Sequence, residues 1–327
     1  MFETIHNSKF MIQNSIWPIV VAVLLIGQTA QADQQGGQRQ AVYLEMGAGG
    51  AANAMGGAAV GMRGDVSCGY WNPAGLIGIR GFQIETQRSF LSMGQELDYL
   101  SLAGTFKDEY SLGLSGILYS AGGDLEARQG PSLAPDKLFD DLEMTLFPSV
   151  AARLSPRWSF GGSFKLFLEN LGSFSGLGFG EDLGIQYRFT NDTTFGFMAQ
   201  DPYSLISYSN NDNSLFPVTL KAGVAHHDAK LNAKMHFDLE WSNDLGFRPR
   251  LGLEWAPAKV IVLRGGCWLG NLTSGAPGGT LTLNPTAGIG LMAFLGDSLV
   301  EFDYTLLPDR IVSGGLTHQI AITGKFL

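Results

Sequence analysis

The residues in this sequence best suited to metal chemistry form one group: His226, His227, Asp228, His236 and Asp238. Imidazole and carboxylate groups are common ligands of transition metals. The first three residues fall at an expected tight turn, whereas His236 lies in the middle of an expected strand. Because such positions do not converge, the sequence predicts no metal site.

Motifs for catalysis are absent from the rest of the chain. It contains no nucleophile elbow, no phosphate-binding loop and no Cys-x-x-Cys pair. The glycine-rich run 47–57 is not a dinucleotide fingerprint, because no strand precedes it. The net charge of −9, without a basic stripe, argues against nucleic acid as a partner. We therefore expect a protein that is not an enzyme and that holds no cofactor.

Charged and apolar residues instead alternate along extended stretches of the chain. In 230–242, large apolar residues occupy one face and residues such as Lys234, His236, Asp238 and Glu240 the other. A period of two indicates β-strands. If the polar faces line a lumen, the lumen-facing candidates are Phe167, His236, Asp238, Glu240, Arg248, Arg250, Glu254, Arg264 and Trp268.

The short connection 242–246 predicts a hairpin centred on Asp244. Its register opposes three pairs of opposite charge on the lumen face: Glu240 with Arg248, Asp238 with Arg250, and Lys234 with Glu254. Each directly opposed pair contributes roughly 0.2–1 kcal/mol. The alternative is a set of solvated charges that make no mutual contact, since many exposed ion pairs are energetically silent.

The same alternation predicts about fourteen strands. They lie near 81–91, 97–106, 110–120, 143–154, 158–169, 179–189, 193–200, 216–226, 231–241, 247–255, 259–269, 282–295, 298–307 and 315–326. Every second connection is a tight turn, and the intervening ones are mostly longer, notably 121–142, 170–178, 201–215, 270–281 and 308–314. Short turns at one end and long loops at the other are typical of outer-membrane barrels. We expect an all-β fold, a transmembrane antiparallel β-barrel.

Composition agrees with a barrel in the bacterial outer membrane. Hydrophobic residues make up 45% of the 327 residues and charged residues only 16%, against roughly 25% in an average soluble domain. Beyond the N-terminus no apolar run is long enough to cross a bilayer as a helix. Residues 1–32 predict a cleaved signal peptide, with the apolar core 16–26 and the small-x-small site 30–32. Residues 79–327 are then the barrel.

Between them, residues 33–78 predict a hatch that folds into the lumen. The stretch 45–65 is nearly all glycine, alanine and methionine, so it is slim enough to fit inside a barrel. It leads to an aromatic turn with Tyr70, Trp71, Asn72, Pro73, Ala74 and Gly75, preceded by Asp65. The alternative is a flexible linker, but two large aromatics are poor choices for a disordered segment.

These residues carry a resemblance. "MGAGGAANAMGGAAVGMRGDVSCGYWNPAGL" (46–76) resembles the N-terminal signature of the FadL-like outer-membrane barrels, closest to the PorV/PorQ-type branch. The similarity extends over about 41–327, through fragments such as "EFDYTLLP" (301–308). It implies a fourteen-stranded barrel with a hatch that carries Asn72, Pro73 and Ala74.

The resemblance implies two different functions. FadL-like members imply passive uptake of small hydrophobic compounds, such as long-chain fatty acids, through a hatch-gated lumen. PorV-like members imply a scaffold or secretion-system component that binds secreted or surface proteins through its loops. Beside the outer-membrane lipid, the expected partner is a hydrophobic small molecule or a protein, and Leu133, Leu138 and Phe139 of loop 121–142 are the candidate capture residues. Whether Cys68 and Cys267 form a disulfide between hatch and wall remains open at this point, because Cys267 shares its face with apolar residues.

Overall fold

The computed structural model describes residues 41–127, 137–172, 174–210, 212–244, 246–270, 282–309 and 315–326. The expected signal peptide and residues 33–40 lie outside this range, as does the capture candidate Leu133.

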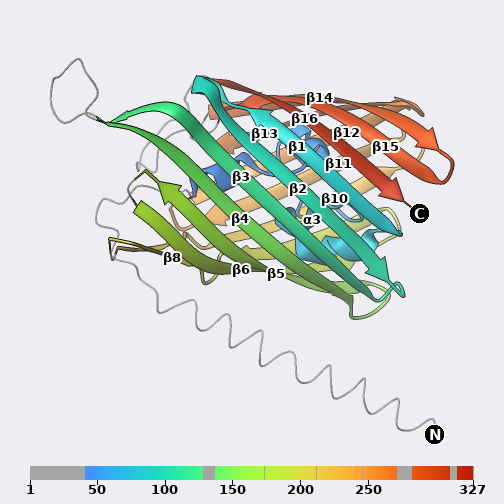
Figure 1. Cartoon of the computed structure of the whole chain (residues 1–327). Coiled ribbons are helices and arrows are strands. Elements are labelled where there is room, and N and C mark those ends of the chain that lie inside the picture. Colours follow the sequence, from blue (N-terminus) through green and yellow to red (C-terminus); the bar gives the residue numbers. More distant parts are fainter. Residues whose placement is uncertain are drawn as a thin grey trace, which may run out of the picture. The chain divides into compact units, whose positions relative to one another are not determined.

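The described chain forms one antiparallel sheet that closes into a barrel (Figure 1). Sixteen strands take part, and two of them, β8 and β9, form a hairpin beyond β7, so fourteen make up the wall. The ring closes through the pairings β1–β16 and β5–β6. The fourteen wall strands are β1 (Phe82–Phe90), β2 (Gln95–Phe106), β3 (Tyr110–Ala127), β4 (Lys137–Arg153), β5 (Trp158–Leu171), β6 (Phe174–Arg188), β7 (Thr193–Gln200), β10 (Thr219–Asp228), β11 (Ala233–Ser242), β12 (Gly246–Ala258), β13 (Ile261–Gly270), β14 (Thr282–Leu295), β15 (Ser298–Pro308) and β16 (Leu316–Phe326). The predicted fold class is confirmed.

The strand connections differ between the two ends of the barrel. One end, called here the turn end, has only the short connections 107–109, 154–157, 189–192, 229–232, 259–260 and 296–297. The opposite end, the loop end, contains the short helix η3 (Ser92–Gly94), the strands β8 (Leu205–Tyr208) and β9 (Asn213–Leu215), and the remaining connections.

Three of the predicted loops are wrong, and one of them, 201–215, contains the strands β8 and β9. Residues 170–178 are not a loop, because β5 and β6 pair as far as Leu171 opposite Phe174 and leave only 172–173 between them. Loop 121–142 is much shorter than predicted, because β3 and β4 pair beyond a register shift as far as Ala127 opposite Lys137. Leu138 and Phe139 therefore belong to strand β4 rather than to a loop. Glycines at 122, 123, 176 and 178 leave gaps in the side-chain alternation, which concealed these strand ends from the sequence.

The β11–β12 hairpin has the predicted register. Glu240 pairs with Arg248, Asp238 with Arg250, and Lys234 with Glu254. On the outward face Phe237 lies opposite Leu251, and both are well exposed. Large apolar side chains project outward all around the ring, as an apolar exterior requires.

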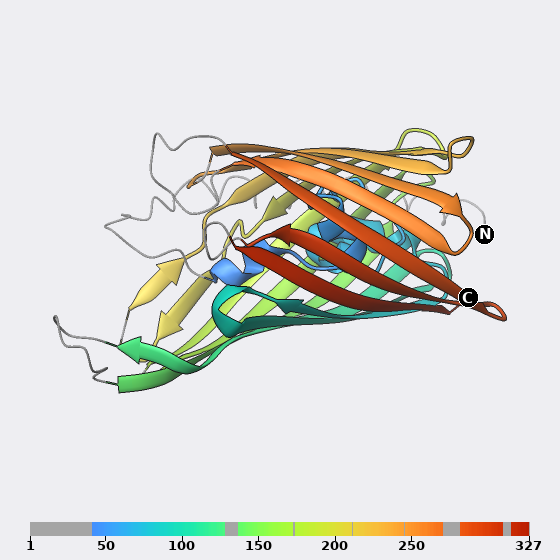
Figure 2. The same cartoon turned by 90° about the horizontal axis from the view of Figure 1, so that it is seen from above.

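The segment 41–78 lies inside the ring of strands, where Figure 2 shows its blue and cyan turns. It consists of four short helices: η1 (Val42–Met46), α2 (Gly50–Ala54), α3 (Cys68–Trp71) and η2 (Pro73–Gly78). No helix in the described part of the chain is long and apolar enough to cross a membrane. We call this segment the hatch, as in the sequence prediction.

Candidate functional site

The hatch fits the lumen because both sides of the contact carry glycine. A side chain at Gly56 would meet the backbone nitrogen of Cys267 at 2.8 Å, and one at Gly252 would meet the carbonyl oxygen of Met55 at 2.7 Å. Gly56 also has a φ of 69°, which L side chains rarely adopt. Backbone-to-backbone packing of this kind explains why the stretch has almost no bulky residues.

The Asn72-Pro73-Ala74 turn is fixed to the wall and to the rest of the hatch. Asn72 is fully buried, its Nδ2 donates to the Val60 carbonyl at 2.8 Å, and its Oδ1 accepts from the Ala74 amide at 3.2 Å. Three wall glycines face the Asn72–Ala74 and Val60 region: Gly161 on β5, Gly184 on β6 and Gly196 on β7. The hydroxyl of Ser159 donates to the Ala74 carbonyl at 3.1 Å. The turn therefore has a matched seat on three adjacent strands.

Tyr70 and Trp71 stabilise the fold of the hatch itself. The Tyr70 hydroxyl donates to the Leu44 carbonyl, and the Trp71 indole donates to the Ala48 carbonyl at 2.6 Å. Their rings meet edge to face at 4.9 Å. The Lys221 ammonium of β10 lies 5.4 Å from the Trp71 ring, within the range of a cation–π contact. The two aromatics thus connect distant parts of the hatch to each other and to the wall.

Asp65 and Gly75 have local structural roles. The Asp65 carboxylate accepts from the Ser67 amide at 3.0 Å and from its hydroxyl at 2.6 Å, so it caps the bend before α3. The Gly75 carbonyl accepts from the Gly64 amide at 2.9 Å, and a side chain at Gly75 would meet the Cys68 sulfur at 2.8 Å. Asp65 therefore fixes the bend before α3, and Gly75 keeps the segments around Gly64 and Gly75 close together.

Polar wall residues hold the hatch backbone by its free amides and carbonyls. Asp238 accepts from the Ala59 and Val60 amides at 2.6 and 2.8 Å. On the other side of the lumen Glu85 accepts from the Gly50 amide at 2.8 Å. Further donors to hatch carbonyls are Gln186, Arg250, Thr286 and Thr305. Short helices leave many backbone groups unpaired, and the wall supplies their partners.

One half of the lumen wall is charged and internally paired. Glu240 pairs with Arg248 and, at 3.0 Å, with Arg250. Arg264 pairs with Asp303, with Glu254 at 2.7 Å and with Glu301 at 2.5 Å. Two of the three predicted pairs make contact, Glu240 with Arg248 and Lys234 with Glu254 at 2.6 Å. The predicted contact between Asp238 and Arg250 is wrong, because Asp238 binds the hatch and Arg250 binds Glu240. Trp268 also faces inward, 6.0 Å from the Arg250 guanidinium, and His236 is buried in the same wall.

The other half of the wall carries an apolar surface towards the loop end, beside the buried Lys165, which pairs with Asp182 and Asp201 at 2.8 Å. Phe167 faces inward as predicted and stacks on Phe216 at 4.5 Å. The remaining members of this surface were not predicted from the sequence: Leu97 and Tyr99 on β2, Ile117 and Tyr119 on β3, Phe147 on β4, and Ile206 on β8. These strands also carry outward-facing apolar residues, such as Leu100 and Leu118. With apolar residues on both faces, the sequence does not show which face points into the lumen. We call this set the apolar wall.

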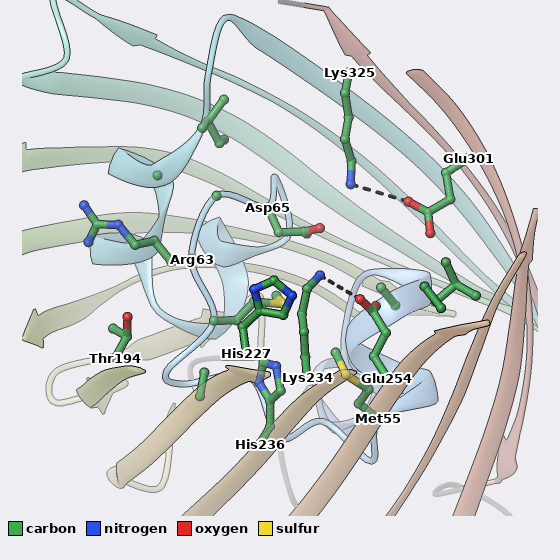
Figure 3. Close-up of a pocket in the computed structure, with 18 of the residues that line it drawn as sticks. Met55, Arg63, Asp65, Thr194, His227, Lys234, His236, Glu254, Glu301 and Lys325 are labelled. Atoms are coloured by element: carbon green, nitrogen blue, oxygen red, sulfur yellow. Dashed lines mark hydrogen bonds and ion pairs between the residues drawn. The ribbon is translucent and has the colours of Figure 1, made fainter. Parts of the chain in front are cut away.

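The hatch separates two spaces of very different size. At the turn end a cavity of about 890 Å³ opens between the hatch and the charged wall, with Arg63, Asp65, His227, Lys234 and Lys325 on its surface (Figure 3). At the loop end a pocket of about 70 Å³ lies beside Tyr70, Trp71 and Phe216. Hatch residues such as Tyr43 fill the adjoining space, where Tyr43 stacks on Tyr119 at 5.8 Å.

Both cysteines of the structure are free. Cys68 is fully buried in the hatch, and burial raises the pKa of its thiol. Cys267 lies on the outward phase of β13 and is partly exposed. In the described residues no group of three or more His, Cys, Asp or Glu side chains is placed to hold a metal ion.

Comparison with protein-family models and with curated proteins gives no match. Solved structures do match, among them the toluene transporter TodX of Pseudomonas putida, with 15% identity and a TM-score of 0.61 over 86% of this chain and 98% of that one. The toluene transporter TbuX of Ralstonia pickettii has 13% identity and a TM-score of 0.60 over 86% and 99%. A FadL homologue of Pseudomonas aeruginosa has 10% identity and a TM-score of 0.58 over 85% and 98%. The chain has the fold of these transport barrels. The PorV/PorQ-type branch is not among these matches and stays a prediction.

Proposed function

We propose that this protein is an outer-membrane barrel that admits small hydrophobic compounds through a lumen closed by the hatch. The turn end then faces the periplasm and the loop end the exterior, as in other outer-membrane barrels. The similar solved structures include a monoaromatic hydrocarbon channel and two toluene transporters, which supports a compound of that class.

The apolar wall is the observation that carries this proposal. A lumen lined only by charges would not attract a hydrocarbon, whereas an aromatic surface removes it from water at about 25 cal/mol per Å² of apolar area buried. The rings of Tyr70 and Phe147 pack edge to face, with their centroids 6.2 Å apart. The apolar wall therefore leads directly to the aromatic turn of the hatch. Passage requires the hatch to move, because its residues fill the space beside this wall.

Uptake of radiolabelled toluene by cells that carry the protein tests the proposal. Phe147→Asn combined with Phe167→Asn places two amides on the apolar wall. We expect toluene uptake to fall by about thirtyfold, since each amide weakens apolar binding by about 1 kcal/mol. Phe164→Asn is the control, because Phe164 lies on the same strand but faces outward. Unchanged uptake in the double variant, with normal surface levels, would contradict the proposal and leave the scaffold alternative.

A further inference from the structure

The cavity at the turn end contains two kinds of basic residue. On one side two lysines have carboxylate partners: Lys234 lies 2.6 Å from Glu254, and Lys325 lies 3.4 Å from Glu301. Figure 3 shows these two pairs together, with Arg63 apart from them. Arg264, deeper in this wall, has three carboxylate partners. The charges of Lys234, Lys325 and Arg264 are therefore neutralised by carboxylates of the wall.

On the other side lie three arginines that form no ion pair with any described carboxylate. Arg63 of the hatch donates from Nη1 to the Ser159 hydroxyl at 3.3 Å. Arg153 donates from Nε to the Asp108 carbonyl at 2.7 Å, and Arg188 donates from Nη2 to the Pro156 carbonyl at 2.6 Å. The carboxylates of Asp108 and Asp192 line the same cavity, but neither reaches ion-pair distance of these arginines. Each guanidinium has five N–H donors and uses one of them on the protein.

The sheet register brings the three arginines together. Ser159 is the cross-strand partner of Arg153 on β4 and of Gln186 on β6, and Arg188 is the next residue of β6 on the same face. Arg63 of the hatch reaches Ser159 on β5. Because β5 lies between β4 and β6, the Arg63 guanidinium lies between the strands that carry Arg153 and Arg188. Burial, together with the charges of Arg153 and Arg188, lowers the pKa of Arg63 to about 10. Three like charges gathered in this way repel each other unless an anion lies between them.

We propose that Arg63, Arg153 and Arg188 bind a soluble oxyanion, a phosphate or a carboxylate, that links the hatch to the rim of the barrel. Guanidinium groups match the geometry of such anions through paired N–H donors. The anion would enter from the open cavity at the turn end. Because it contacts both hatch and wall, it would bind the seated hatch better than the displaced one and so favour closure.

Titration of the full-length protein in neutral detergent with inorganic phosphate, against chloride of equal ionic strength, tests the binding. We expect saturable binding, weakened about tenfold by each of Arg63→Gln, Arg153→Gln and Arg188→Gln, since one charge-assisted contact is lost in each. Arg157→Gln is the matched control, an exposed arginine on the same rim whose side chain reaches the Tyr187 hydroxyl at 3.4 Å. Sodium acetate as a second titrant shows whether the site prefers phosphate or carboxylate.

Hydrogen exchange of the peptide that spans 60–66 tests the link to the hatch. Phosphate should slow this exchange in the unmodified protein and in Arg157→Gln, but not in the Arg153→Gln, Arg188→Gln double variant. Arg153→Lys keeps the charge but loses the paired donors, so weaker phosphate binding in that variant would support the geometry even if a glutamine variant fails to fold. Absence of saturable binding of both anions, or equal weakening in the Arg157→Gln control, would overturn the proposal.

Discussion

At the scale of single residues, Asp238 shows how the wall and the hatch depend on each other. Its position opposite Arg250 suggested an ion pair, yet its carboxylate accepts two hatch amides instead. The sequence could give the register, because register follows from alternation and the turn. It could not give this contact, since a backbone amide has no sequence signature and every residue of 41–78 except Pro73 carries one.

We therefore expect that reversing both charges will not rescue the barrel. Asp238→Arg should lower the free energy of unfolding by about 2 kcal/mol or more, because two buried amides lose a charged acceptor. Adding Arg250→Asp removes a second hatch contact and a partner of Glu240, so stability should fall further. A double-mutant cycle by urea unfolding measures this. Recovery of stability in the double variant would instead show that Asp238 and Arg250 act as a pair.

At the scale of elements, strand positions and tight turns were the predictable part of the fold. All six connections at the turn end are short, as the sequence predicted, and the strands between them have the expected faces. What the sequence missed lies at the loop end, where glycines interrupt the alternation of β6 and where β8 and β9 replace an expected loop. Glycine marks places where another backbone approaches, and such places are visible only when both partners are known.

Gly161 is one such place, because it contacts the backbone of the Asn72-Pro73-Ala74 turn, and it allows a test. Gly161→Ala would put a methyl group 2.8 Å from the Ala74 Cα, so we expect overpacking of about 1–3 kcal/mol that acts against the seated turn. Maleimide labelling of the buried Cys68, in a Cys267→Ser background, should then accelerate about tenfold. Cys68 reports on the hatch because its thiol reacts only when it reaches solvent.

Gly162→Ala is the control for this experiment. Gly162 adjoins Gly161 on β5 but faces outward, and an added methyl would lie 3.5 Å from the Asp182 carbonyl oxygen, an ordinary contact. Its Cys68 labelling rate should match that of the unmodified protein. Equal rates in both alanine variants would show that the wall glycines do not form the seat of the turn.

At the scale of the whole molecule, the lumen divides into a charged wall and an apolar wall, with the hatch against both. Most charged residues of the charged wall pair with one another. Others, such as Asp238, bind the hatch backbone instead. The apolar wall packs against η1 and the aromatic turn. Hydrogen bonds from both sides of the lumen fix the hatch, for example from Asp238 and Glu85, and the apolar wall adds a surface of the kind that a hydrophobic compound would contact.

Removal of the hatch tests whether it is a closure or a part of the folding core. Every wall strand pairs on both sides with other wall strands, so the backbone hydrogen bonds of the barrel do not require residues 41–78. We expect the protein without 41–78 to fold, to show heat-resistant mobility on gels, and to conduct small ions in planar bilayers far better than the full chain. Asp238 and Glu85 would then face water in a widened lumen, where hydration replaces the lost amides at little cost. A matched deletion of 33–40 alone should leave conductance unchanged. If the protein without 41–78 fails to fold, the buried contacts of the hatch are required for the barrel, and the hatch is no independent gate.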